Sequence, residues 1–290
     1  MADYQPGTPK LQEQDLQGKV AIVTGATKGI GRAIALDLST RGCSILGTYS
    51  SPQSAHNFDT LSHTVGDLYQ DPYSSRASSV TPGSNAPTFK GVVADITSLP
   101  SVGTVLRDFG GKIDILVLNA AVNVRPRVGE ASEADVARSL MRNVQWPVVL
   151  VENLVRQRCF NANSRVVAIS SDRVRDPSPG STLFTSTKSA LESLTRCWSL
   201  ELPLLFPGTT SNAISVGLTD TPGLRSYPPA AVSALKAARL AKVKVAEGGR
   251  LGYAEDVADV VGWLVGEKSR WVTGSVVAAN GGAEYVGGAS

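Results

Sequence analysis

The sequence has 290 residues, a length that suits one α/β nucleotide-binding domain with a large buried core. Its apolar fraction of 42% and charged fraction of 18% are typical of a soluble globular protein, and a net charge of +3 without a dense Lys/Arg block argues against nucleic-acid or membrane-surface binding. The 3 scattered cysteines, the 2 histidines without cysteine partners and the absence of a signal peptide or a long apolar run predict a cytoplasmic protein with no disulfide framework, no metal site and no membrane span.

Short apolar runs alternate with helix-length periodic segments after a polar N-terminal tail at residues 1–17. This alternation predicts one domain over residues 18–290, in which a doubly wound parallel sheet lies between two helical layers, the three-layer α/β/α arrangement of Rossmann-type folds. The predicted strands are residues 20–23, 44–47, 91–94, 113–118, 166–169, 212–216 and 275–278.

Helical periodicity follows the first strand, where Ile30, Ile34 and Leu38 fall on one face, and returns at residues 144–155 and 191–198. Two other segments break the rhythm. Residues 70–87 are rich in Ser, Pro, Gly and Asn and predict a mobile surface insertion. An irregular stretch from 218 to about 230, with three prolines, opens a predicted substrate loop at about 218–245.

A glycine-rich turn connects the first strand to the first predicted helix. Glycines let the backbone turn sharply and let a pyrophosphate approach closely, and the helix N-terminus offers free N–H groups to the anion. The strand–turn–helix context that such a motif requires is present, so we expect a dinucleotide site here. Its predicted contacts are Thr24, Gly25, Thr27, Lys28, Gly29, Ile30 and Gly31.

The spacing Thr-Gly-x-x-x-Gly-Ile-Gly resembles the signature of the short-chain dehydrogenase/reductase superfamily, and the resemblance runs from about residue 18 to 282. Asp95 matches the acidic residue that meets the adenine. Asn119-Ala120-Ala121 resembles the family's Asn-Asn-Ala-Gly stretch with two departures, and Asn280-Gly281-Gly282 resembles its Asp-Gly-Gly. The resemblance implies a small-molecule substrate and a homodimer or homotetramer.

The end of the second strand predicts NADP(H) rather than NAD. NAD-preferring sites place a carboxylate there to accept from the ribose 2′-hydroxyl, but this chain has Thr48-Tyr49-Ser50-Ser51. Ser50 and Ser51 could donate to a 2′-phosphate and Lys28 could pair with it.

The resemblance also assigns a catalytic row. It carries the family's Asn to Asn143, its Ser to Ser171 and its Lys to Lys188, which is also expected to bind the nicotinamide ribose. The family's tyrosine falls on Phe184, both by the count from Ser171 and by the Tyr-x-x-x-Lys spacing. Phenylalanine has no proton to give, and a positioned general acid is worth roughly 10²–10⁴ in rate.

The presence of Phe184 has three explanations: another group donates the proton, the reaction needs no proton donor, or the protein has lost catalysis. Asp172 could relay a proton if burial raises its pKa. Ser171, or a water held by Lys188 and Asn143, is a second source. Tyrosines could also swing over the site; the candidates are Tyr69, Tyr73 and Tyr227.

The turn after the sixth strand reads Val216-Gly217 where the family usually has Pro-Gly, with Thr219 and Thr221 placed to meet the cofactor. Gly217 still lets the backbone approach the cofactor closely, so we expect the cofactor to bind although Val216 replaces the proline. Arginines 125, 127, 173 and 175 follow the fourth and fifth strands, and would suit a substrate with acidic or polar oxygen groups unless they are simply solvated.

We therefore expect an NADPH-dependent oxidoreductase acting on a small carbonyl or imine, with an atypical proton source. An iminium ion becomes a neutral amine on accepting hydride and needs no donor tyrosine. Two alternatives stay open. The first is a non-redox cyclase or isomerase of secondary metabolism, which accelerates its reaction by orienting the substrate. The second is a non-catalytic NADP-binding scaffold.

Overall fold

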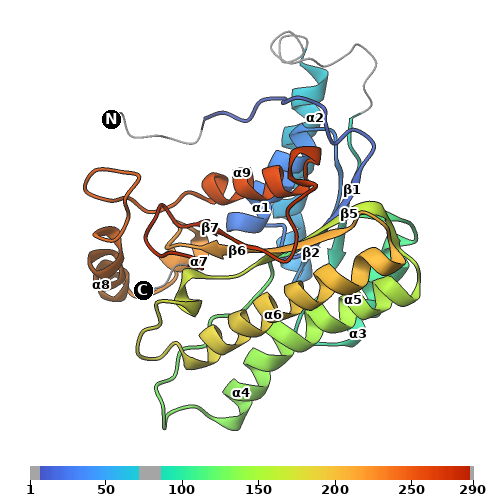
Figure 1. Ribbon diagram of the computed structural model, residues 1–290. Helices are drawn as coiled ribbons and strands as arrows, with labels where there is room; N and C mark the ends of the chain where they lie inside the picture. Colours follow the sequence, from blue (N-terminus) through green and yellow to red (C-terminus); the bar gives the residue numbers. More distant parts are fainter. Residues whose placement is uncertain (1–6, 72–85, 288–290) are drawn as a thin grey trace.

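A computed structural model describes residues 7–71 and 86–287. Its centre is a 7-stranded parallel sheet in the order β3-β2-β1-β4-β5-β6-β7 (Figure 1). All the predicted strands are confirmed, with ends shifted by a few residues. The strands are β1 (Val20–Val23), β2 (Ser44–Tyr49), β3 (Phe89–Val93), β4 (Ile113–Leu118), β5 (Phe160–Ile169), β6 (Thr210–Val216) and β7 (Val276–Ala279).

Helices cover both faces of the sheet, so the predicted doubly wound α/β/α fold is confirmed (Figure 1). Each β–α–β crossover returns the chain to a parallel strand. The α-helices are α1 (Gly29–Thr40), α2 (Ala55–Gln70), α3 (Pro100–Phe109), α4 (Glu133–Leu140), α5 (Trp146–Arg156), α6 (Thr182–Leu205), α7 (Pro222–Arg225), α8 (Pro229–Leu240) and α9 (Ala254–Val265).

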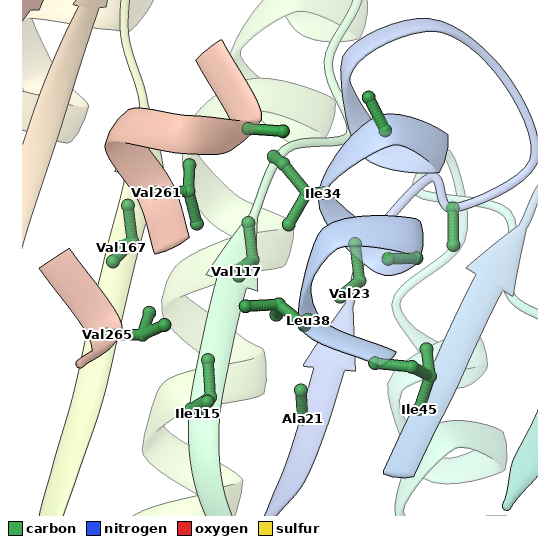
Figure 2. Close-up of a cluster of buried hydrophobic side chains, with 14 of the residues drawn as sticks. Ala21, Val23, Ile34, Leu38, Ile45, Ile115, Val117, Val167, Val261 and Val265 are labelled. Atoms are coloured by element: carbon green, nitrogen blue, oxygen red, sulfur yellow. The ribbon is translucent and has the colours of Figure 1, made fainter. Parts of the chain in front are cut away.

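Each face of the sheet has its own hydrophobic core. On one face, Ile34 and Leu38 of α1 meet Val261 of α9 over Ile115 and Val117 of β4 (Figure 2). On the other face, the side chains of α5 and α6 cover the opposite sides of the same strands. Strands buried on both faces explain the nearly continuous apolar runs in the sequence.

The substrate loop predicted as irregular is largely helical, which corrects that prediction. Pro222 is the first residue of α7 and Pro229 the first residue of α8. Proline at the first helical position removes an N–H that has no partner there and presets the backbone angle, so these prolines begin helices instead of breaking them. α8 lies at one edge of the molecule, beside the ends of β6 and β7 (Figure 1).

The two segments predicted to lie outside the regular fold have different outcomes. In the tail, Leu11 and Leu16 are buried, and Gln12 donates to Asp37 of α1 at 2.8 Å. Of the insertion predicted at 70–87, residues 72–85 lie outside the described residues.

Within the described ranges, no helix has the length and apolar character to cross a membrane, and no group of three or more metal-ligating side chains gathers.

Candidate active site

Two adjoining cavities lie beyond the carboxyl ends of the strands, where doubly wound folds bind ligands. The first, of about 540 Å³, lies against the glycine loop and the ends of β2 and β3. The second, of about 510 Å³, lies against β5, β6 and the start of α6. Lys28, Asn119, Ala121 and Val122 line both cavities. Because they share these four residues, the two cavities form one continuous groove.

The glycine loop has the geometry that a phosphate cradle requires. Gly25 and Gly29 have φ angles of 71° and 54°, in the left-handed region that favours glycine. A Cβ on Gly31 would lie 2.1 Å from the carbonyl oxygen of Gly25, so no side chain fits there. Lys28 precedes α1, and its side chain makes no capping hydrogen bond to the helix. The first turn therefore keeps N–H groups and a positive dipole end for an anion.

Asn119 and Thr24 join the loops that follow β4 and β1. The Asn119 amide donates to the Thr24 carbonyl oxygen at 2.8 Å, and its backbone N–H donates to Thr24 Oγ1 at 2.9 Å. Thr24 Oγ1 in turn donates to the Val117 carbonyl oxygen at 3.2 Å. Thr24 is thus buried and holds the two loops together without lining the first cavity, whereas Asn119 lines that cavity.

The end of β2 presents hydroxyls to the first cavity. Ser50 lines the cavity as predicted, together with Tyr49 and Ser54, which the sequence analysis did not single out. Ser51 does not line it; its Oγ lies 3.5 Å from that of Ser54. Asp95 supplies the one carboxylate among the described residues of this cavity, so no acid at the end of β2 opposes a 2′-phosphate.

Asn143 lies in a π-helical turn, Met141–Gln145, between α4 and α5. Its Oδ1 accepts from the Val122 N–H at 2.8 Å, and its Nδ2 donates to the Val122 carbonyl oxygen at 2.8 Å and to Thr187 Oγ1 at 3.0 Å. The carboxamide is buried and its hydrogen bonds are taken by protein groups. In this arrangement it fixes the loop after β4 against α6.

Two serines follow β5 and have different partners. Ser170 donates to Glu192 at 2.7 Å, and Glu192 also holds Arg175 through two hydrogen bonds of 3.0 and 2.8 Å. Ser171 Oγ accepts from the Arg173 N–H at 3.2 Å and lies 3.5 Å from Asp172 Oδ1. With Ser170 committed to Glu192, Ser171 has the freer hydroxyl in the second cavity.

Asp172 is buried and forms an ion pair with Arg239 of α8, which also pairs with Asp176. Burial raises the pKa of Asp172, and the charge of Arg239 opposes that shift. Sequence reasoning missed Arg239, because no local pattern links two residues so far apart along the chain. The pair fastens α8 over the segment that carries Ser171.

Lys188 is fully enclosed on α6, one turn after Phe184. Its Nζ donates to the Ile169 carbonyl oxygen at 2.6 Å and lies 5.8 Å from the centroid of the Phe184 ring. Burial lowers the pKa of Lys188 to about 8. Phe184 lines the second cavity with Lys188 and Ser171, so an apolar ring lies beside an ammonium group that titrates near neutral pH.

The turn after β6 forms the opposite wall of the second cavity through Val216, Gly217, Thr219 and Thr221. A Cβ on Gly217 would lie 2.8 Å from Asn280 Cα, which explains why glycine occupies this turn. Ile30 also reaches this cavity, whereas Gly29 and Gly31 line neither half of the groove.

The three tyrosines proposed as proton donors are placed differently. Tyr227 lines the second cavity. Tyr69 does not: its hydroxyl donates to Gln14 at 2.6 Å and to the Ser39 carbonyl oxygen at 3.2 Å, at the C-terminal end of α1, so that suggestion was wrong. Tyr73 lies outside the described residues.

Comparison with known proteins identifies the chain. It matches the family model described as enoyl-(acyl carrier protein) reductase over residues 25–284. It is 29% identical to the 3-oxoacyl-(acyl-carrier-protein) reductase FabG of Haemophilus influenzae, over 92% of this chain and 98% of the relative. It is 30% identical to the short-chain dehydrogenase/reductase FrzI of Cladobotryum sp, over 92% and 96%.

Solved structures agree with this assignment. The angucycline C-6 ketoreductase LanV, solved with bound NADP, superposes with a TM-score of 0.77 at 25% identity, over 94% of this chain and 98% of that one. A short chain dehydrogenase from Burkholderia cenocepacia in complex with NADP gives a TM-score of 0.73 at 27% identity, over 93% and 99%. The chain therefore belongs to the short-chain dehydrogenase/reductase superfamily.

Proposed function

We propose that the protein is an NADP(H)-dependent oxidoreductase that transfers hydride to or from a small carbonyl or imine substrate, with a proton source other than a tyrosine on α6. One observation carries the proposal: Lys28 of the glycine loop lines both cavities, and Ser171 and Lys188 line the second of them. The NADP-bound neighbours support the choice of cofactor.

The residues of the first cavity fit a phosphorylated dinucleotide. Lys28 and Ser50 can bind a 2′-phosphate, the free N–H groups of α1 a pyrophosphate, and Asp95 an adenine edge. The residues of the second cavity fit the nicotinamide half. There Lys188 would bind the ribose, while Thr219 and Thr221 would meet the carboxamide. Thr24, Gly29, Gly31 and Gly217 serve by shaping the backbone around the groove.

When bound, the reduced nicotinamide supplies hydride to the substrate carbon. Ser171 then orients the substrate oxygen or nitrogen by a hydrogen bond, and Asn143 keeps the loop after β4 in place. Lys188 carries a proton close to the reacting end of the groove, and burial lowers its pKa to about 8, so it gives up that proton more readily than an exposed lysine does.

The proton that completes carbonyl reduction has three candidate carriers in the second cavity: Lys188, Asp172 through Ser171, and Tyr227. Asp172 can donate only while it is protonated, a form that its burial favours and its ion pair with Arg239 disfavours. An iminium substrate removes the requirement, since hydride addition alone yields the neutral amine. Phe184 therefore favours iminium ions over ketones.

The test is turnover of NADPH with matched substrates. Purified protein is incubated with NADPH and with aldehydes, ketones and N-methylated cyclic iminium ions of similar size, while NADPH absorbance and products are followed together. We expect one NADPH consumed for each reduced product, with iminium ions reduced faster than ketones. Product formed without loss of NADPH would instead establish the non-redox cyclase or isomerase, and NADPH binding without any product would indicate the scaffold.

A further inference from the structure

The substrate end of the groove carries an excess of positive charge. Among the described residues that line the second cavity, the basic ones are Lys28, Arg125, Arg173, Lys188 and Arg239, and the one carboxylate is Asp172. Asp172 is already paired with Arg239. A bound ligand must therefore face cationic groups that the protein itself does not neutralise.

The neighbouring basic residues are neutralised, which sets Arg125 and Arg173 apart. Arg175 is held by both oxygens of Glu192, and Lys242 pairs with Asp176 at 2.8 Å. Within the described parts of the chain, neither Arg125 nor Arg173 forms an ion pair. Arg125 donates to Ser178 Oγ at 2.9 Å, and Arg173 reaches the Asp176 carbonyl oxygen at 3.4 Å.

The Arg173 guanidinium is partly buried among other positive charges. Burial, the charge of Arg239 and the charge of Arg125 all lower the pKa of Arg173, although Asp172 partly opposes them. Like charges gathered beside a half-buried cavity are unfavourable unless an anion joins them. Each guanidinium has five N–H donors and most of them remain available, in the forked geometry that fits a carboxylate.

The second cavity also has apolar lining residues. Phe184, Leu218, Leu224 and Leu235 contribute hydrophobic side chains to its lining. The cavity thus brings Arg125 and Arg173, from the loops after β4 and β5, together with apolar side chains from α6 and the segment 218–235.

We infer that the substrate is a carboxylic acid with a hydrophobic body, whose carboxylate is bound by Arg173 and Arg125 while its carbonyl or imine carbon faces the hydride site. This inference rests on the proposed function for the reaction but not for the binding. Arg173 and Arg125 are then the residues that select acids over neutral compounds.

The test uses acid and ester pairs. Protein loaded with NADP⁺ is titrated calorimetrically with 4-formylbenzoate and methyl 4-formylbenzoate, and with 4-oxopentanoate and its methyl ester; the same pairs are then assayed with NADPH. A hydrogen bond to a charged group is stronger than one to a neutral group, so we expect at least one acid to bind about tenfold more tightly than its ester, a difference of about 1.4 kcal/mol.

The variants assign the effect to the two arginines. Arg173→Gln and Arg125→Gln should each remove most of the preference for the acid, and Arg173→Lys should keep part of it. Arg127→Gln is the matched control, because Arg127 is exposed on the same loop and does not line the cavity. Unchanged NADP⁺ affinity in each variant shows that the groove is intact.

Two outcomes overturn the inference: no acid binds more tightly than its ester, or the preference survives in both glutamine variants. Acid binding that depends on Arg173 but leads to no NADPH oxidation keeps this inference and instead contradicts the proposed oxidoreductase. The two failures are thereby distinguished.

Discussion

The Lys188 ammonium lies 5.8 Å from the centroid of the Phe184 ring, one turn away on α6. A hydroxyl on that ring would enter the same cavity as Ser171. We therefore expect Phe184→Tyr to raise the rate of ketone reduction by about 10²-fold or more, the usual contribution of a general acid. Reduction of an iminium ion should change little, since hydride addition alone yields the neutral amine.

Phe184→Leu is the control for this substitution, because it alters the packing without adding a hydroxyl. The measurement is the ratio of ketone to iminium turnover at saturating NADPH. If the tyrosine variant binds NADPH normally but gains no ketone reduction, the site lacks more than the donor.

Lys188 should make stability depend on pH. Its pKa in the folded protein, about 8, is below the ordinary value of 10.5. Between these values the unfolded chain binds the proton more readily, so stability rises as the pH increases through this window. Below pH 8 the buried charge costs on the order of 3 kcal/mol, and above 10.5 the cost is gone.

Lys188→Met should therefore stabilise the cofactor-free protein at pH 7, and the gain should shrink as the pH approaches 10. Urea unfolding of both proteins across this range measures it. Lys268→Met, at an exposed position, should show no such trend. A gain that stays constant with pH would mean that the Lys188 ammonium is not destabilised by burial.

The Asp172–Arg239 pair should be essential for the position of α8. Arg239→Ala leaves Asp172 buried without its main cationic partner, which typically costs about 3–5 kcal/mol. Removing both charges with Asp172→Asn and Arg239→Met should cost less than the single change. Urea unfolding and limited proteolysis in α8 report this, and a double variant less stable than Arg239→Ala would contradict it.

Lys28 should set the preference for NADPH. It lines both cavities and no carboxylate stands at the end of β2. Lys28→Ala should weaken NADPH binding about tenfold or more and change NADH binding by less than about twofold, because only NADPH carries the 2′-phosphate. Fluorescence titration measures both, with Lys268→Ala as the control. Equal losses for the two cofactors would place Lys28 against the pyrophosphate instead.

The strands and first helix could be predicted because their signals are local: apolar runs for β1 to β7, and Ile34 and Leu38 on one face of α1. The helices α7 and α8 could not, because Pro222 and Pro229 signal a helix start and a loop equally well. Glycine spacing located the phosphate cradle, since steric limits leave few other residues possible there.

The partners of the site residues could not be predicted. The sequence suggests Asn143 as a catalytic residue, but its side-chain amide is saturated by Val122 and Thr187. Arg239 comes to Asp172 only through the fold. Tyr69 illustrates the reverse error, because a tyrosine far from the site in space looked available in the sequence.

The most direct test of the account is NADPH binding by the glycine cradle, measured calorimetrically for the unaltered protein, Gly31→Ala and Gly66→Ala. A Cβ at Gly31 would lie 2.1 Å from the Gly25 carbonyl oxygen and 2.5 Å from Asn119 Nδ2, whereas one at Gly66 meets nothing within 4 Å. We predict that the unaltered protein and Gly66→Ala bind NADPH equally and that Gly31→Ala loses binding. No NADPH binding by the unaltered protein, or full binding by Gly31→Ala, would contradict the account.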